Sequence, residues 1–133
     1  MNNSYIDIYE TMYNVDLVVA NKYTTIEQLN KEYSFSDDTD INKEILEGCA
    51  STCTCKRRST GKYVLLVKFN RISKIKGIDK KSDLINTCSH EACHVALHIY
   101  EYIGAEVSIT NQEPYCYLTA WITECIYKTI TKK

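Results

Sequence analysis

The segment from Ser82 to Ile103 constrains the chain most, because it combines an apolar helical stripe with two histidines four residues apart. A helix that packs through one face carries apolar residues at steps of three and four. This segment has such residues at Ile85, Cys88, Ala92, Val95, Ile99 and Tyr102. Gly104 follows as a C-terminal stop. The sequence therefore predicts an amphipathic helix over about 82–103.

The face opposite this stripe carries His90 and His94, the two histidines of an H-E-x-x-H pattern. Residues four apart share one helix face, so both imidazoles can bind one metal ion. Glu91 lies beside them, where it can take a proton from a metal-activated water without being a ligand. The pattern predicts a catalytic zinc ion with His90 and His94 as ligands and Glu91 as general base. The alternative is an exposed polar face that happens to carry histidine.

A catalytic zinc ion usually has three protein ligands. His98 continues the spacing, but at ~1.5 Å per residue it lies about 12 Å from His90 along the axis, too far to share an ion. Glu113 begins a later helix, beyond a loop that can turn the chain back. It also completes a helix-capping pattern with Thr110, so spacing leaves both roles open. Two other acids are weaker alternatives, Glu106 and Glu124.

The H-E-x-x-H pattern followed by Asn111-Gln112-Glu113-Pro114-Tyr115-Cys116-Tyr117-Leu118 resembles the zincin metallopeptidases of gluzincin type. It is similar to the small ImmA/IrrE-like and phage-encoded H-E-x-x-H proteins over about residues 82–126. The resemblance implies His90, His94 and Glu113 as zinc ligands, Glu91 as catalytic base, and a protein or peptide as substrate. A second oxyanion donor is usual in related enzymes. The tyrosines near the motif in sequence are Tyr100, Tyr115 and Tyr117.

The rest of the chain predicts a single α+β domain over residues 1–133. We expect one or two strands in 5–21, a short helix from the capping pattern at Thr24-Thr25-Ile26-Glu27 to about Tyr33, and a β-hairpin in 48–70. A final helix is expected over about 112–130. This order predicts a small antiparallel sheet packed on the H-E-x-x-H helix and the C-terminal helix, a minimal zincin-like arrangement.

Charge is unevenly distributed, although the net charge is only −1. Residues 1–47 carry ten acids against three bases, whereas residues 56–81 carry ten bases against one acid. We interpret the basic run as a solvated hairpin with lysines at its edge. The alternative is a patch that binds nucleic acid, although no interleaved aromatic platform supports it.

The cysteine pattern bears on location and on a second metal. Seven cysteines, no signal peptide and no apolar run long enough to cross a membrane predict a cytoplasmic protein with reduced thiols, in the host cytoplasm if phage-encoded. Cys49, Cys53 and Cys55 are candidates for a structural metal, but their alternation with threonine also suits one face of a strand. Cys93 is expected to pack rather than bind metal.

Three functions are therefore open from the sequence. The favoured one is a zinc-dependent peptidase. The second is a catalytically silent zincin-fold binding or regulatory protein, and the third is a nucleic-acid-associated protein that uses residues 56–81.

Overall fold

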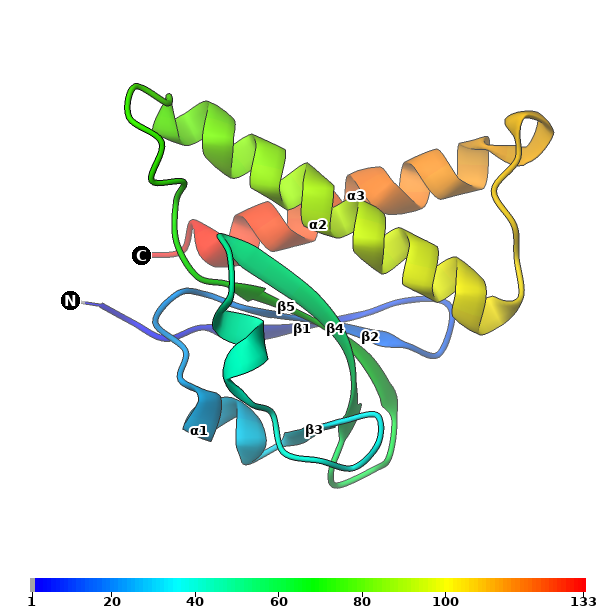
Figure 1. Ribbon diagram of the computed structural model, residues 1–133. Coiled ribbons are helices and arrows are strands. Elements are labelled where there is room, and N and C mark those ends of the chain that lie inside the picture. The colour runs from blue at the N-terminus through cyan, green and yellow to red at the C-terminus, as the bar shows by residue number, and fades with distance from the viewer. Residues whose placement is uncertain (1) are drawn as a thin grey trace.

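The computed structural model describes residues 2–133 and contains a five-stranded sheet with three α-helices (Figure 1). The strands are β1 (Ile6–Glu10), β2 (Asp16–Ala20), β3 (Tyr33–Phe35), β4 (Ala50–Arg57) and β5 (Tyr63–Phe69). The α-helices are α1 (Ile26–Asn30), α2 (Lys80–Ile103) and α3 (Glu113–Ile130). Two short 3-10 helices are η1 (Lys43–Leu46) and η2 (Ile109–Asn111). The α+β class predicted from the sequence is confirmed.

The sheet is mixed, with strand order β1-β2-β5-β4-β3, so the prediction of an antiparallel sheet is wrong in one respect. β2 and β5 run parallel, with Leu17 opposite Leu65, whereas the other three strand pairs are antiparallel. The chain between β2 and β5 contains α1, β3, η1 and β4, which is long enough for the crossover that parallel strands require. The two central strands are almost wholly buried because both faces of the sheet are covered.

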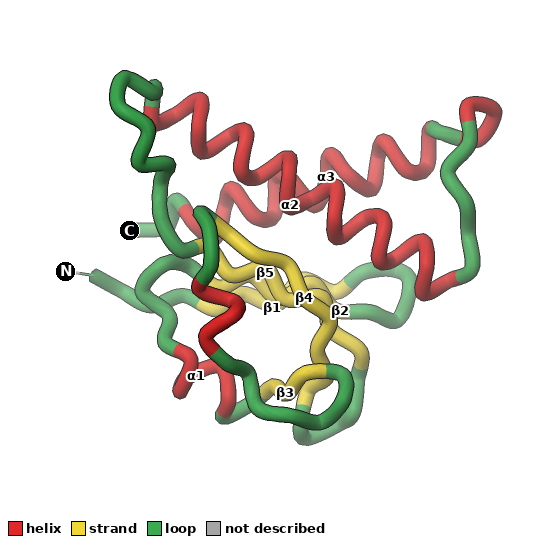
Figure 2. Tube along the Cα trace, in the orientation of Figure 1, coloured by secondary structure: helices red, strands yellow, loops and turns green. Residues whose placement is uncertain are grey.

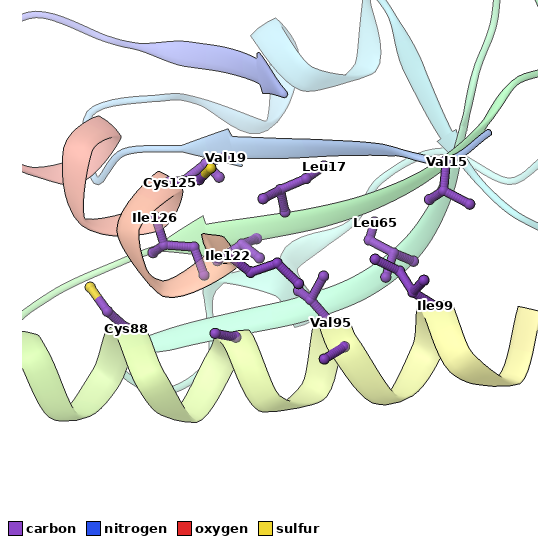
Figure 3. Close-up of a cluster of buried hydrophobic side chains, with 13 residues drawn as sticks. Val15, Leu17, Val19, Leu65, Cys88, Val95, Ile99, Ile122, Cys125 and Ile126 are labelled. Atoms are coloured by element: carbon purple, nitrogen blue, oxygen red, sulfur yellow. The ribbon is translucent and has the colours of Figure 1, made fainter. Parts of the chain in front are cut away.

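Alternate residues of the central strands supply two separate cores. Leu17, Val19, Leu65 and Val67 face α2 and α3, which cross over one side of the sheet (Figures 1 and 3). Val18, Ala20, Val64 and Leu66 face α1 and η1 on the other side (Figure 2). The molecule therefore has three layers, and the histidine-bearing helix belongs to the outer layer on one side.

The ends of α2 are set by local capping. Asp79 accepts a hydrogen bond from the Ser82 backbone N–H, so the helix begins at Lys80, slightly earlier than predicted. Gly104 ends it in the left-handed conformation, with φ of 73°. Only the middle of the predicted stripe is buried: Ile85 is 50% exposed and Tyr102 is 46% exposed. The sheet is shorter than α2, and both ends of the helix extend past it (Figure 1).

The short helix ends before the predicted Tyr33. Its N-cap is Thr25, whose side chain and Gln28 exchange the two hydrogen bonds of a capping box. The helix stops at Asn30, and Tyr33 lies in β3, where it is fully buried. The sequence pattern missed this three-residue strand, since Tyr33 also fits the helical spacing.

Four of the ten bases in the basic run pair with acids from earlier in the chain. Arg57 and Lys62 both approach Asp16, at 3.8 Å and 2.9 Å. Lys56 and Arg58 pair with Asp38 and Asp40 at 3.1 Å and 2.7 Å. The β4–β5 turn and its flanks are therefore neutralised by earlier acids, whereas the six bases from Lys68 to Lys81 form no ion pair in residues 2–133.

No α-helix in residues 2–133 combines the length and apolar character needed to cross a membrane. The two ends of the described chain, residues 2–133, lie close together (Figure 1). Lys132 pairs with Asp7 at 2.6 Å, and the Tyr5 hydroxyl donates to the Lys133 carbonyl oxygen at 2.9 Å.

Lys68 is an exception to the apolar core, because it is only 1% exposed. Burial lowers the pKa of its ammonium from 10.5 to about 8. Below pH 8 both folded and unfolded states hold the proton, and the cost of burying the charge is fully present. Between pH 8 and 10.5 only the unfolded state holds it, so the stability of the folded protein rises through this window.

We therefore predict that replacing Lys68 with Met changes the pH dependence of stability. Relative to Lys68→Met, the free energy of unfolding of the wild type should rise by about 2 kcal/mol between pH 7 and pH 9.5. Urea denaturation at several pH values measures this difference. Lys31→Met, at an exposed lysine, is the control and should follow the wild-type profile. Parallel profiles for wild type and Lys68→Met would contradict the account.

Candidate metal centre

The rotation of α2 about its own axis is fixed by its packing on the sheet. Cys88, Ala92, Val95 and Ile99 are fully buried against the central strands and α3 (Figure 3). At about 100° per residue, this setting turns His90 and His94 outward, and both are exposed. The prediction that the histidines face away from the apolar stripe is confirmed.

The two imidazoles are arranged as they would be around one metal ion. Their Nε2 atoms are 3.2 Å apart, and the rings meet edge to face with centroids at 4.8 Å. Two nitrogens bound at ~2.0–2.1 Å to a tetrahedral zinc ion would be about 3.3 Å apart. The observed separation of the two nitrogens therefore fits two ligands of a single zinc ion.

Glu91 completes this group from the inner side of the helix. Each of His90, Glu91 and His94 offers one possible ligand atom, and these three atoms lie within 4.8 Å of one another. Glu91 is only 4% exposed, and its Oε2 atom lies 3.8 Å from His90 Nε2. A carboxylate beside the two nitrogens is placed to accept a proton from a water molecule held there.

The Glu91 carboxylate is held by β4. The Thr52 hydroxyl donates to Glu91 Oε1 at 3.2 Å, which orients the carboxylate and partly compensates its burial. Thr52 and Thr54 share the face of β4 that is opposite Cys53 and Cys55, as alternation along a strand requires. The sequence showed this alternation, but it did not reveal that the threonine face would meet Glu91.

A pocket of about 170 Å³ opens beside the group. It lies between the start of β4 and the N-terminal half of α2, and is lined by Cys49, Ala50, Asn86, Thr87, His90 and Glu91. Sequence reasoning did not associate Asn86 or Ala50 with the histidines, because only the packing of α2 on β4 brings them together.

Glu113 does not join this group. It is exposed at the start of α3, and the metal-ligating group found in residues 2–133 contains only His90, Glu91 and His94. Tyr115 fixes the rotation of α3, since its hydroxyl lies 3.3 Å from Cys93 Sγ on α2. Glu113 precedes Tyr115 by two residues, about 200° around the helix, so it points away from α2.

His98 also lies outside the group, as do the two weaker acidic alternatives. His98 is partly buried one turn beyond His94, while Glu106 and Glu124 are exposed. Within the described chain, the arrangement therefore provides two imidazoles and one carboxylate, all from α2.

The tyrosines considered as oxyanion donors lie to the side of the histidine pair. Tyr100 and Tyr115 pack edge to face, with centroids 5.3 Å apart, on the flank of α2 that carries Cys93. Burial, and then the contact with Cys93, raises the pKa of Tyr115 to about 12, so its hydroxyl stays protonated. Tyr117 is 74% exposed and lines a different groove with Met12 and Trp121.

Cys49, Cys53 and Cys55 do not converge on one point. Cys53 and Cys55 face the α1 side of the sheet with their sulfurs 3.6 Å apart, whereas Cys49 lines the pocket beside His90. The contact between the two thiols lowers the pKa of Cys53 and raises that of Cys55. No second metal-ligating group is found in residues 2–133. Cys93, expected to pack rather than bind metal, is exposed, and its sulfur lies 3.3 Å from the Tyr115 hydroxyl.

No protein-family model, curated protein or solved structure matches this chain. The geometry of the α2 group is thus the basis for a functional proposal.

We predict that Thr52→Val destabilises the protein because Glu91 loses its donor while remaining buried. The free energy of unfolding should fall by about 1.5–3 kcal/mol, the range for a hydrogen bond to a charged group. Thr54→Val is the matched control, since the Thr54 hydroxyl meets the exposed Ser36 hydroxyl and should cost at most about 1 kcal/mol. Urea denaturation measures both, and equal losses would argue against a special role for Thr52.

Proposed function

We propose that this protein is a zinc-dependent peptidase in which His90 and His94 bind the metal and Glu91 is the general base. The observation that carries the proposal is the 3.2 Å separation of the two Nε2 atoms, with the Glu91 carboxylate beside them. The H-E-x-x-H spacing supports it independently, because it supplies the same residue types that metallopeptidases use. The substrate would be a protein or peptide.

The residues present fit zinc chemically, since two neutral imidazole nitrogens are ordinary zinc ligands. When bound, zinc would supply a Lewis acid that polarises a carbonyl group and lowers the pKa of a water ligand to about 7. Glu91 would accept the proton from the attacking water and deliver it to the leaving amine. Thr52 would hold the carboxylate in place during both transfers.

The third protein ligand is proposed to be Glu113. It reaches the histidine pair only if the first turn of α3 moves, because it faces away from α2 in the present arrangement. The competing arrangement uses Glu91 as a ligand, which would leave the site without its general base. In the first arrangement the metal requires Glu113, and in the second it requires Glu91.

We further propose a zincin-like arrangement and a cytoplasmic location. The order of a mixed sheet, the H-E-x-x-H helix and a following helix supports the first. The second rests on the seven cysteines, since an odd number leaves at least one thiol without a partner in the chain. Free thiols are typical of a reducing compartment.

A catalytically silent, metal-binding regulatory protein is the second candidate. The position of Glu113 favours it, since a metal held by few ligands on an open helix face suits binding as well as catalysis. Nucleic-acid binding through residues 56–81 is less favoured, because four of the ten bases, Lys56, Arg57, Arg58 and Lys62, are paired with acids.

We predict about one zinc ion per chain, lost in His90→Ala and His94→Ala. Both substitutions remove a ligand nitrogen from the pair, and elemental analysis after dialysis measures the bound metal. His98→Ala is the matched control and should retain zinc. Glu113→Gln should weaken zinc binding if Glu113 is the third ligand, whereas an unchanged zinc content would remove it from the ligand set.

We predict that Glu91→Gln retains zinc and abolishes peptide cleavage. The amide keeps the size of the side chain but cannot accept the water proton, so the rate should fall by at least about 100-fold, the usual contribution of a general base. Cleavage is measured by comparing peptides in a whole-cell extract treated with wild type or with the variant. Loss of zinc in Glu91→Gln would favour the ligand role, and identical peptide profiles would favour the regulatory protein.

A further inference from the structure

A second pocket lies on the face of the sheet that is opposite α2 and α3. Its volume is about 430 Å³, and none of its residues lines the pocket beside His90. The walls come from the turn after β2, α1, η1 and the end of β5. The lining residues are Lys22, Thr24, Thr25, Ile26, Glu27, Lys43, Leu46, Lys68 and Asn70.

Lys68 contributes a buried cation to this pocket. Its Nζ atom donates to the backbone oxygens of Asn21 at 3.0 Å and Phe69 at 2.8 Å. An ammonium group has three N–H donors, so one remains after these two bonds. No carboxylate of residues 2–133 lies within 4.0 Å of Nζ. Buried charges in proteins are normally paired, and this one lacks an anionic partner.

The remaining charges around the pocket are also mostly positive. Lys22 follows β2, Lys43 begins η1, and the only acid in the lining is Glu27 on α1. Three lysines against one glutamate give the pocket a positive potential. Asn70 adds a buried Oδ1 atom without a hydrogen-bond partner, while its Nδ2 atom donates to the Ile45 carbonyl oxygen.

We propose that this pocket binds a small molecule through a phosphate or carboxylate group that pairs with Lys68. The anion would accept the third Lys68 N–H and be attracted by Lys22 and Lys43. The volume leaves room for a ligand larger than a free phosphate ion. A donor on that ligand would satisfy Asn70 Oδ1.

Inorganic phosphate and acetate are the two probes that test the proposal. Lysine side-chain carbon resonances are followed by NMR at pH 7.5, with sodium chloride at equal ionic strength as reference. One of the two probes should shift the Lys68 resonance saturably, and should raise the pKa of Lys68 above its value in chloride. Binding of phosphate would indicate a phosphate group on the ligand, and binding of acetate would indicate a carboxylate group.

Thermodynamic linkage provides a second readout for the probe that binds. At ten times its dissociation constant, the probe should lower the unfolding constant of the wild type about elevenfold. In Lys68→Met the same concentration should change it less than about twofold, which also separates site binding from general salt effects. If neither probe shifts Lys68 beyond chloride, or if Lys68→Met is stabilised equally, the proposal is wrong.

A variant that leaves the core intact still tests the proposal if Lys68→Met does not fold. The double substitution Lys22→Gln and Lys43→Gln changes only exposed side chains and should weaken the probe at least threefold. Lys74→Gln with Lys76→Gln removes the same charge from an exposed segment that does not line the pocket, and should leave affinity unchanged. Equal affinity in both double variants would overturn the proposal.

Discussion

The packing of α2 on the sheet is the constraint on which the candidate metal centre depends. Cys88, Ala92, Val95 and Ile99 fix the rotation of the helix, and this sets the direction of every side chain between them. His90 and His94 must face outward, and Glu91 must point toward β4. A rotation of about 50° would bury a histidine or expose the carboxylate. The apolar stripe therefore determines the chemistry of the opposite face.

The sequence predicted this helix well because the relevant information is local. The apolar periodicity, the helix cap and the histidine spacing all lie within about 25 residues, and Gly104 marks the end of the helix. The parallel pairing of β2 with β5 and the short β3 depend on contacts between distant segments, which periodicity does not encode. Thr52 was visible as one face of a strand, but its contact with Glu91 spans 39 residues.

The third ligand shows the same division between local and long-range information. The downstream motif placed Glu113 on a helix, and that part is confirmed. The direction in which Glu113 points depends on how α3 rotates, and the contact between Tyr115 and Cys93 sets that rotation.

The two faces of the sheet also differ in character. One carries an exposed histidine pair with a carboxylate, and the other carries a buried lysine without a counter-ion.

The most direct test of the account is X-ray absorption at the zinc edge on the zinc-loaded protein. We expect two imidazole nitrogens at ~2.0 Å with oxygen atoms completing the site, and a spectrum that changes when His90 or His94 is replaced. A sulfur ligand at ~2.3 Å, from Cys49 or Cys93, would contradict the ligand assignment. Failure of the protein to hold zinc at all would contradict the central claim.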